Sequence, residues 1–210
     1  MTHISFQLLP DSLNSLKNES ILIVGNGPSA AKYDLGERID GFDRVIRINN
    51  YVTSGLESRV GSKTDIWING SNQGLKKRTT IPDHTLVMIP STVLEHKGDA
   101  IHQRIEKRLG TTDYTLLPIA VMQEMEESCG IERPTTGFFA IYFLYLLGLD
   151  ITLHGFDFFV GSKAHYFDNA FNRWLKDKGI IKKAAKHKVV AEKAFVESLV
   201  NSGKIKFLRQ

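Results

Sequence analysis

Short apolar runs rich in β-branched residues recur along the chain, separated by polar turns. Ile21–Gly25 is wholly apolar and ends in glycine, and Asp43–Asn49 alternates polar and apolar residues. Runs of this kind are typical of buried strands in a parallel sheet. The same reasoning predicts strands over Thr64–Asn69, Thr85–Ile89 and Asp150–His154, with shorter ones over Tyr114–Leu117 and Lys204–Leu208.

Segments with helical spacing alternate with these runs. Ile101–Leu109 has an apolar residue at every fourth position, and Ala120–Glu127 and Val190–Leu199 are also predicted to be helical. Gly137–Leu149 is apolar all round, which indicates a buried helix, and the threonines before it are suitable N-caps. With no internal repeat or linker, the pattern predicts one α/β domain over residues 1–210. Its sheet should be mostly parallel, with about six or seven strands flanked by helices.

The composition is that of an ordinary globular protein. The 210 residues are 42% hydrophobic and 24% charged, and 27 Lys and Arg against 23 Asp and Glu give a net charge of +4. These values exclude disordered and disulfide-rich classes, and the weak positive charge suits a phosphorylated ligand without demanding nucleic acid. Cys129 is the only cysteine, so neither an internal disulfide nor a cysteine-rich metal site can form.

No segment of the sequence predicts secretion or membrane insertion. Met1–Leu9 lacks a basic stretch followed by a long apolar run, and Gly137–Leu149 is shorter than the roughly 20 residues that span a bilayer. We therefore expect a cytoplasmic protein, associated at most peripherally with the inner face of a membrane.

Candidate chemistry gathers where the predicted strands end. The segment GNGPS at 25–29 follows the first strand, and Pro28 suits the first turn of a helix that continues over Ala30–Leu35. Its glycines let a ligand approach the backbone, and a helix N-terminus favours an anion. The third glycine of a dinucleotide fingerprint and the Lys-Ser/Thr pair of a P-loop are both missing. A tight turn without a ligand is the alternative interpretation.

Asparagines and a glycine mark the ends of several predicted strands. Asn26, Asn49, Asn69 and Gly155 each end or follow one. Parallel sheets bind ligands beyond the carboxyl ends of their strands, and an amide offers both a donor and an acceptor to a base or a ribose. Asparagine is also common at strand ends for purely structural reasons, so both interpretations stay open.

Thr135, Thr136 and Gly137 stand at the head of the predicted buried helix. Two hydroxyls, free backbone N–H groups and the positive end of the helix dipole would together hold a phosphate or a nucleoside. A plain N-cap, which a buried helix needs in any case, is the alternative.

Two histidines in the last quarter of the chain are candidates for proton transfer. His165 lies in an irregular segment, and His187 lies five residues before Glu192, a spacing that puts the two on different faces of a helix. The dipole at a helix N-terminus disfavours imidazolium, and a neutral imidazole can act as a general base. Solvated surface histidines are the alternative. Residues 173–188 hold seven Lys or Arg, which suits a lid, an acceptor surface or merely a solvated face.

Taken in order, these segments resemble the motifs of glycosyltransferase family 29, the sialyltransferases of eukaryotic type. VGNGPS at 24–29 and IDGFDRVIRIN at 39–49 are similar to the family's large motif, and VGSKTD at 60–65 to its tail. RPTTGFFA at 133–140 resembles the small motif and LHGFD at 153–157 the strand after it. HYFD at 165–168 resembles the third motif, and HKVVAE at 187–192 fits the very small motif, H-x-x-x-x-E. VGNGPS is also similar to the start of the bacterial sialyltransferases of family 42.

The resemblance implies a modified Rossmann (GT-A-like) domain with its motif-bearing core over 21–199. It implies inverting transfer of an acidic sugar from a CMP donor to a glycan hydroxyl, without a metal or another cofactor. His165 would steady or protonate the departing phosphate, His187 would take the proton of the acceptor, Tyr166 would contact substrate and Glu192 would be structural. The nucleotide-binding residues would be Gly25, Asn26, Gly27, Ser29, Asn49, Asn69, Thr135, Thr136, Gly137, Gly155 and Phe156.

The chain departs from secreted-pathway members of the family in one respect. Those members carry a cysteine in the large motif and one in the small motif, joined as a disulfide, and here both regions lack cysteine. This favours a bacterial enzyme that uses CMP-sialic acid or CMP-Kdo to build lipopolysaccharide, capsule or another surface glycan. Two other hypotheses remain. A non-catalytic nucleotide- or sugar-binding module would not need both histidines, and another Rossmann-like transferase, such as a methyltransferase, would bind S-adenosylmethionine instead of CMP.

Overall fold

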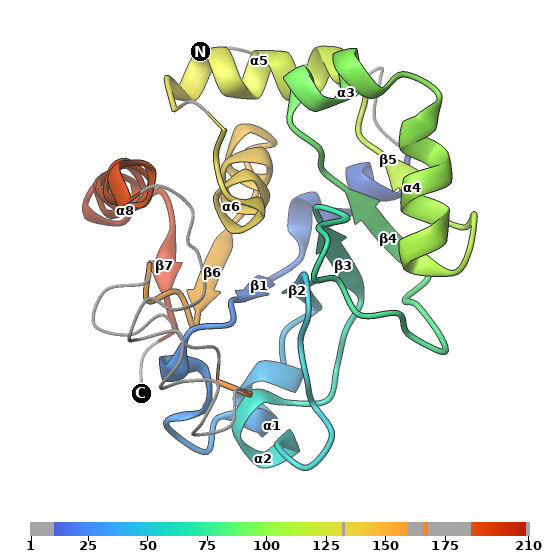
Figure 1. Ribbon diagram of the computed structural model, residues 1–210. Coiled ribbons are helices and arrows are strands. Elements are labelled where there is room, and N and C mark those ends of the chain that lie inside the picture. Colours follow the sequence, from blue (N-terminus) through green and yellow to red (C-terminus); the bar gives the residue numbers. More distant parts are fainter. Residues whose placement is uncertain (1–10, 132, 159–165, 168–185, 209–210) are drawn as a thin grey trace.

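A seven-stranded parallel sheet organises the computed structural model, which describes residues 11–131, 133–158, 166–167 and 186–208 (Figure 1). The strand order is β5-β4-β3-β2-β1-β6-β7, and every pairing among the described strands is parallel. All carboxyl ends therefore meet at one edge of the sheet. The strands are β1 (Ile21–Val24), β2 (Arg44–Ile48), β3 (Ile66–Asn69), β4 (His84–Val87), β5 (Thr115–Leu116), β6 (Ile151–His154) and β7 (Lys206–Phe207).

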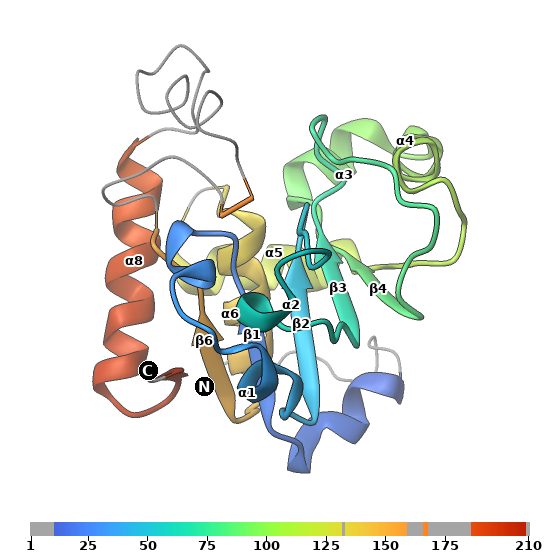
Figure 2. The same ribbon diagram turned by 90° about the horizontal axis from the view of Figure 1, so that it is seen from below.

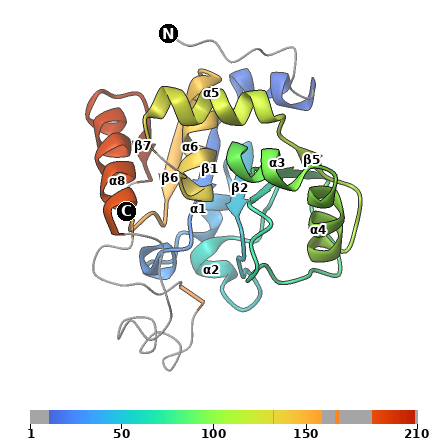
Figure 3. The same cartoon turned by 45° about the horizontal axis from the view of Figure 1, so that its top comes forward.

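The main core lies on one face of the sheet. Ile21 and Ile23 of β1 point into it, whereas Leu22 and Val24 point to the opposite face, as the two-residue period of a strand requires. Figures 1 and 3 show α5 (Ile119–Cys129) and α6 (Thr136–Leu146) over this face, with α3 (Ser91–Lys97) beside α5 and α8 (Lys186–Asn201) beside α6.

Helix α6 has no polar face because it is enclosed on every side. Seven successive residues, Phe138–Leu144, are buried between the sheet, α5 and α8. Phe195 of α8 meets the rings of Phe138 and Tyr142 edge-on, with centroids 5.5 and 5.2 Å apart. The expectation of a buried helix is confirmed. No helix in the described ranges, α6 included, has the length and apolarity needed to cross a membrane.

The opposite face is covered by shorter elements. Figure 2 shows α1 (Gly36–Asp40) and α2 (Glu57–Val60) in front of β1 and β2. Helix α4 (Ala100–Leu109) packs its apolar stripe on Trp67 and Val87 further along the sheet. On the main-core side of the sheet, the 3₁₀ helix η2 (Asp11–Asn18) precedes β1 and buries Leu13 and Leu16.

The prediction of a helix over Ala30–Leu35 is wrong. Instead of a helix over Ala30–Leu35, the chain forms a 3₁₀ helix, η3 (Pro28–Ala31), with Pro28 at its start as expected, and α1 follows separately. The backbone here is held by the end of β6. Asp157 accepts a hydrogen bond from the Ser29 amide at 2.9 Å, and the His154 ring bonds the Ala30 carbonyl oxygen at 3.0 Å. The partner of the Ala30 carbonyl oxygen is therefore a side chain of β6, where a longer helix would supply a backbone N–H from its next turn. The other predicted strands and helices are present, with ends shifted by a few residues.

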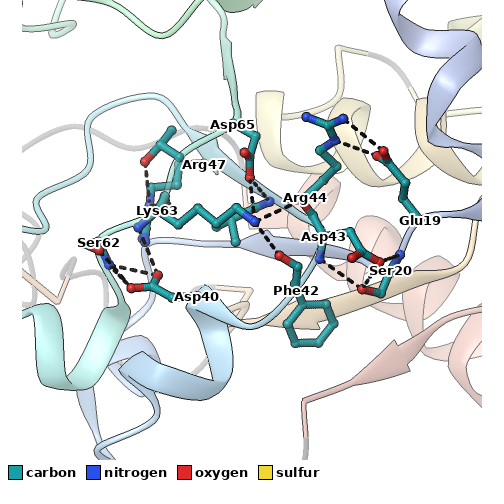
Figure 4. A network of polar contacts seen from close by, with 12 residues as sticks. Glu19, Ser20, Asp40, Phe42, Asp43, Arg44, Arg47, Ser62, Lys63 and Asp65 are labelled. Atoms are coloured by element: carbon teal, nitrogen blue, oxygen red, sulfur yellow. Dashed lines mark hydrogen bonds and ion pairs between the residues drawn. The ribbon is translucent and has the colours of Figure 1, made fainter.

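Charged side chains tie the amino ends of β1, β2 and β3 together (Figure 4). Arg44 makes a two-pronged contact with Glu19 at 2.6 and 2.9 Å, and Asp43 accepts hydrogen bonds from the amide and hydroxyl of Ser20. Asp65 accepts the Val45 amide at 2.7 Å. These contacts fix the alignment of three strands at the edge opposite to the one where the predicted site residues lie.

The same network encloses a buried cation. Arg47 is 0% exposed, and its guanidinium donates to the carbonyl oxygens of Val60, Gly61 and Lys63. Burial lowers the pKa of Arg47, and no carboxylate hydrogen-bonds it in the described residues. These carbonyl groups and the Thr64 hydroxyl accept from Nε and one Nη, while the other Nη has no partner among the described residues. The VGSKTD segment at 60–65 thus holds β2 and β3 in place.

Candidate active site

The carboxyl ends of β1, β2, β3 and β6 and the first turn of α6 surround a cavity of about 460 Å³. Segments from residue 25 to residue 192 contribute to its wall, because parallel strands end at the same edge. Nine of the eleven residues that the sequence predicted as nucleotide-binding line this cavity: Gly25, Asn26, Gly27, Asn49, Thr135, Thr136, Gly137, Gly155 and Phe156.

Two backbone turns touch at the floor of the cavity, and their contact explains the glycines. The Gly25 amide donates to the His154 carbonyl oxygen at 2.7 Å, and the Gly27 amide donates to the Gly155 carbonyl oxygen at 2.8 Å. A Cβ on Gly25 would lie 2.5 Å from the Gly155 oxygen. A Cβ on Gly27 would lie 2.4 Å from a carboxylate oxygen of Asp157. The two glycines are therefore required for turn-to-turn packing, independently of any ligand.

The asparagines after β1 and β2 have different surroundings. Asn26 donates its side-chain amide to the Ile48 carbonyl oxygen at 2.8 Å, which ties the glycine turn to β2. Asn49 has a φ of 49°, and its side-chain oxygen accepts the Gly70 amide at 3.1 Å. Asn49 lines the cavity, and its side-chain nitrogen has no hydrogen-bond partner among the described residues. This nitrogen is therefore a donor without a protein acceptor.

The N-terminus of α6 presents free donors to the same cavity. Thr135 is the N-cap, and its hydroxyl oxygen accepts the Phe138 amide at 3.2 Å. The amides of Thr136 and Gly137 come before the first hydrogen bonds of the helix and have no partner in the described part of the chain. Together with the positive end of the helix dipole, they form a site suited to an anion.

Glu192 of α8 holds this N-cap in place. The backbone amide and the hydroxyl of Thr135 each donate to one oxygen of the Glu192 carboxyl group, both at 2.7 Å. The Glu192 side chain is buried at 2% exposure, and burial raises its pKa while the two bonds from Thr135 act to lower it. The HKVVAE segment at 187–192 is thus linked to the RPTTGFFA segment at 133–140 by the Glu192 carboxyl group. This contact gives Glu192 the structural role expected of it.

Apart from Tyr166, four predicted residues lie elsewhere or cannot be placed in the cavity. Asn69 does not line it, because its buried amide oxygen accepts the Ser71 amide and its neighbour Gly70 reaches the cavity instead. Ser29 uses its amide on Asp157, outside the lining. His165 lies outside the described residues, and so does the side chain of His187, whose backbone belongs to the first turn of α8.

Tyr166 is placed differently from the sequence expectation. Its ring is 8% exposed, and its hydroxyl donates to the Val52 carbonyl oxygen at 2.6 Å and accepts the Val52 amide at 3.0 Å. Its backbone amide donates to the Asn26 carbonyl oxygen at 3.1 Å. Tyr166 is absent from the cavity lining, so the structure gives it a positioning role where the sequence predicted contact with substrate.

Sequence reasoning missed several residues of the cavity wall. Arg133, Asp157 and Phe158 all line the cavity, and Asn72 does so from the loop after β3. Asp157 and Arg133 stand inside the quoted segments LHGFD and RPTTGFFA, so their position beside residues already singled out was an available signal. No such signal marks Asn72. Within the described ranges, no three His, Cys, Asp or Glu side chains converge as a metal site would require.

Solved structures with the same fold are sialyltransferases. A mammalian sialyltransferase in complex with Gal-beta-1-3GalNAc-ortho-nitrophenol matches with a TM-score of 0.66 at 18% identity, over 97% of this chain and 76% of that one. The sialyltransferase CstII from Campylobacter jejuni, in complex with the substrate analogue CMP-3FNeuAc, matches with a TM-score of 0.53 at 20% identity, over 90% and 80%. At these identities the likeness establishes the modified Rossmann, GT-A-like fold.

Sequence relatives and a family model agree with the fold. The human CMP-N-acetylneuraminate-beta-1,4-galactoside alpha-2,3-sialyltransferase is 44% identical over 63 residues, which span 30% of this chain and 16% of the human protein. The chimpanzee type 2 lactosamine alpha-2,3-sialyltransferase is 23% identical over 231 aligned positions, which span 95% and 67% of the two chains. The first of these matches thus spans about a sixth of the relative's length. The model of glycosyltransferase family 29 (sialyltransferase) matches residues 3–204, and the chain belongs to this family.

Proposed function

We propose that this protein transfers an acidic sugar from a CMP-sugar donor to a hydroxyl group of a glycan. One observation carries the proposal. In a chain of family 29, the glycine turn, Asn49 and the N-terminus of α6 line a single cavity of about 460 Å³. That volume lies within the range typical of small-molecule sites.

The chemistry of the wall suits a nucleoside monophosphate. The free amides of Thr136 and Gly137, with the helix dipole, would accept the negative charge of one phosphate, and Arg133 adds a cation to the same wall. The side-chain nitrogen of Asn49 would donate to the base or the ribose. Preoriented donors of this kind also stabilise a phosphate as it departs. This supports a reaction that needs no metal ion.

A larger side chain at Gly137, placed to fill part of the cavity, tests the nucleotide site. A Cβ on Gly137 would lie 3.4 Å from Phe156, so the branched side chain of Gly137→Val would occupy space between α6 and Phe156. We expect CMP affinity to fall by about tenfold or more, measured by calorimetric titration. Gly41→Val is the matched control, since a Cβ there would also lie 3.4 Å from its nearest atom, at the end of α1 and outside the cavity wall. A folded Gly137→Val protein that binds CMP normally would refute the assignment.

The donor sugar is proposed to be sialic acid or Kdo, both carried as CMP conjugates, and the acceptor a glycan or glycolipid of a bacterial surface. The relatives' printed names refer to CMP-N-acetylneuraminate, which supports sialic acid, and the absence of cysteine from both motif regions supports a bacterial setting. Hydrolysis of CMP-sialic acid and of CMP-Kdo by the purified protein, measured side by side, distinguishes the sugars. Release of CMP from neither donor would contradict the enzyme assignment and favour a binding module.

Two histidines are proposed to move the protons, on the strength of their motifs. His187 would accept the proton of the attacking hydroxyl, and His165 would steady or protonate the departing phosphate. His187→Ala should lower turnover about 10²–10⁴-fold, with CMP affinity nearly unchanged. His165→Ala should lower both. His84→Ala, in an exposed position at the start of β4, is the control and should change neither. Normal turnover in His187→Ala would reject this mechanism, and a large loss of CMP affinity in that variant would reverse the two roles.

A further inference from the structure

A second cavity, of about 520 Å³, lies between α4 and the loop after β3. We call it the α4 pocket and define it by Leu75 and Lys77 of the loop and Arg104, Lys107 and Arg108 of α4. Ala100 and Gln103 of α4 complete the wall, so four of its seven residues carry a positive charge and none carries a carboxylate. None of the four forms an ion pair with any acidic side chain in the part of the chain that the structure describes.

The arrangement of α4 concentrates these cations on one side. Ile101, Ile105 and Leu109 bury one stripe of the helix against the sheet, and this fixes which side faces outward. Arg104 is separated from Lys107 by three residues and from Arg108 by four, so the three side chains are neighbours on the helix surface. Like charges at these spacings disfavour a helix. Their grouping therefore has a cost to the fold, which the position of Lys107 and Arg108 in the last turn of α4 offsets in part.

The two guanidinium groups of the pocket have different surroundings. Arg108 donates to the Ser71 carbonyl oxygen and so joins α4 to the loop after β3. The Nε atom of Arg104 is buried and has no hydrogen-bond partner among the described residues. Burial, and after it the charge of Arg108, lowers the pKa of Arg104. The two Nη atoms of Arg104 also have no hydrogen-bond partner among the described residues and, unlike Nε, are not enclosed, so they are the donors that a ligand in the pocket can reach.

We propose that the α4 pocket binds a phosphate or carboxylate group carried by a saccharide. An anionic oxygen would accept hydrogen bonds from the Nη groups of Arg104 and neutralise part of the surrounding charge. The saccharide is inferred from the nearness of the α4 pocket to the first cavity, where the acceptor glycan is proposed to react. Asn72 lines the first cavity and Lys77 lines the α4 pocket, and the five residues of chain from one to the other span at most about 18 Å. This step rests on the proposed function, since it makes the bound group an acidic substituent of the acceptor glycan.

The Arg104 side chain provides the readout. Glucose 6-phosphate and glucuronic acid are titrated into ¹⁵N-labelled protein saturated with CMP, and the arginine Nε–H resonances are followed by NMR, with Arg104→Gln as the assignment standard. We expect a saturable shift of the Arg104 signal with at least one of the two acids and none with glucose. Lys107→Gln should weaken binding about tenfold or more, as the loss of a charged contact does. Lys97→Gln, which removes an exposed charge at the end of α3 outside the pocket, should leave it unchanged.

Several outcomes would overturn the proposal. These are the absence of a saturable shift with either acid, an equal response to glucose, and equal loss of affinity in the Lys97→Gln control. If inorganic phosphate binds as tightly as glucose 6-phosphate, the pocket is a site for the free ion and the saccharide assignment fails. Binding of the acids to CMP-free protein that is lost when CMP is added would place them in the first cavity. Failure of the proposed function is a separate result, because it appears as absence of CMP binding or of donor hydrolysis.

Discussion

Replacing Glu192 with alanine tests how strongly α8 controls the N-terminus of α6. Both donors of Thr135, its amide and its hydroxyl, would lose acceptors that now lie at 2.7 Å. Hydrogen bonds to a charged group contribute about 1.5–3 kcal/mol each, and the cost of burying the carboxylate offsets part of this sum. We expect the free energy of unfolding to fall by about 3 kcal/mol, which for a chain of this length lowers Tm by roughly 6–12 °C.

The functional consequence follows from the same contact. An N-cap without its acceptors leaves the first turn of α6 less fixed, and the free amides of Thr136 and Gly137 belong to that turn. CMP affinity in Glu192→Ala should therefore fall by about tenfold. Glu192→Gln should recover part of the loss, because its carbonyl oxygen can still accept the Thr135 amide.

Glu197 on the same helix offers the matched control. It pairs with Lys193 at 2.6 Å across one turn, but about half of its side chain is exposed. Exposed pairs of this kind contribute about 0.5 kcal/mol or less. Chemical denaturation and calorimetric titration with CMP are measured for both alanine variants. The reasoning is refuted if Glu192→Ala is no less stable than Glu197→Ala, or if the two bind CMP equally well.

The acidity of Glu192 adds a dependence on pH. Its pKa in the folded protein lies above the ordinary value of 4.5, mainly because of burial. As pH rises, the unfolded chain therefore releases this proton first, and stability falls across the window from 4.5 to the raised folded value. Glutamine has no such proton to lose. The advantage of the native protein over Glu192→Gln should thus shrink as pH rises from about 4 to 8, and an advantage that grows would contradict the expected direction.

Three further predictions concern the turns and the chemistry of the cavity. Gly155→Ala should destabilise the fold by about 2 kcal/mol more than Gly203→Ala, since both have a φ near +70° but only at Gly155 would a Cβ meet another atom, at 2.6 Å; equal unfolding free energies would count against this. Burial lowers the pKa of His154 below its ordinary 6.5, so the unfolded chain takes up this proton first and stability should fall as pH drops below 6.5. His154→Gln should flatten that slope in denaturation curves, and an unchanged slope would assign it to another group. Turnover should persist in excess chelator, and loss that manganese or magnesium restores would show that a metal is needed.

The strands of the sheet were predictable because burial on both faces demands apolar, β-branched runs. Ile21–Val24 is buried at every position, as expected for four successive apolar residues in a strand that is covered on both faces. The prediction of a short helix after Pro28 was wrong because contacts with a distant part of the chain decide the local structure. Its backbone is held by Asp157 and His154, which lie more than 120 residues away in the chain. Local spacing carries no information about such partners.

In the site, too, local sequence predicted some features and contacts between distant residues decided others. Asn49 and Asn69 both come at the end of a predicted strand and cannot be told apart in the sequence. The structure separates them, because Asn49 reaches Gly70 across the sheet and lines the cavity, whereas Asn69 bonds its own turn two residues later. The α4 pocket was hidden for a related reason. The periodicity of α4 was evident, but Lys77 joins it from a separate loop.

The central place of β1 has a consequence for how the protein is synthesised. Ile21 pairs with Arg44 on one side and with Ile151 on the other. A nascent chain can therefore join β1 to β2 early, while the opposite edge of β1 stays open until Ile151, which is 107 residues after Arg44, has left the ribosome. The turn that Gly155 gives to the cavity floor is missing for just as long. During this interval the unfinished sheet has an exposed edge that other chains can pair with, and the proposed nucleotide site is still incomplete.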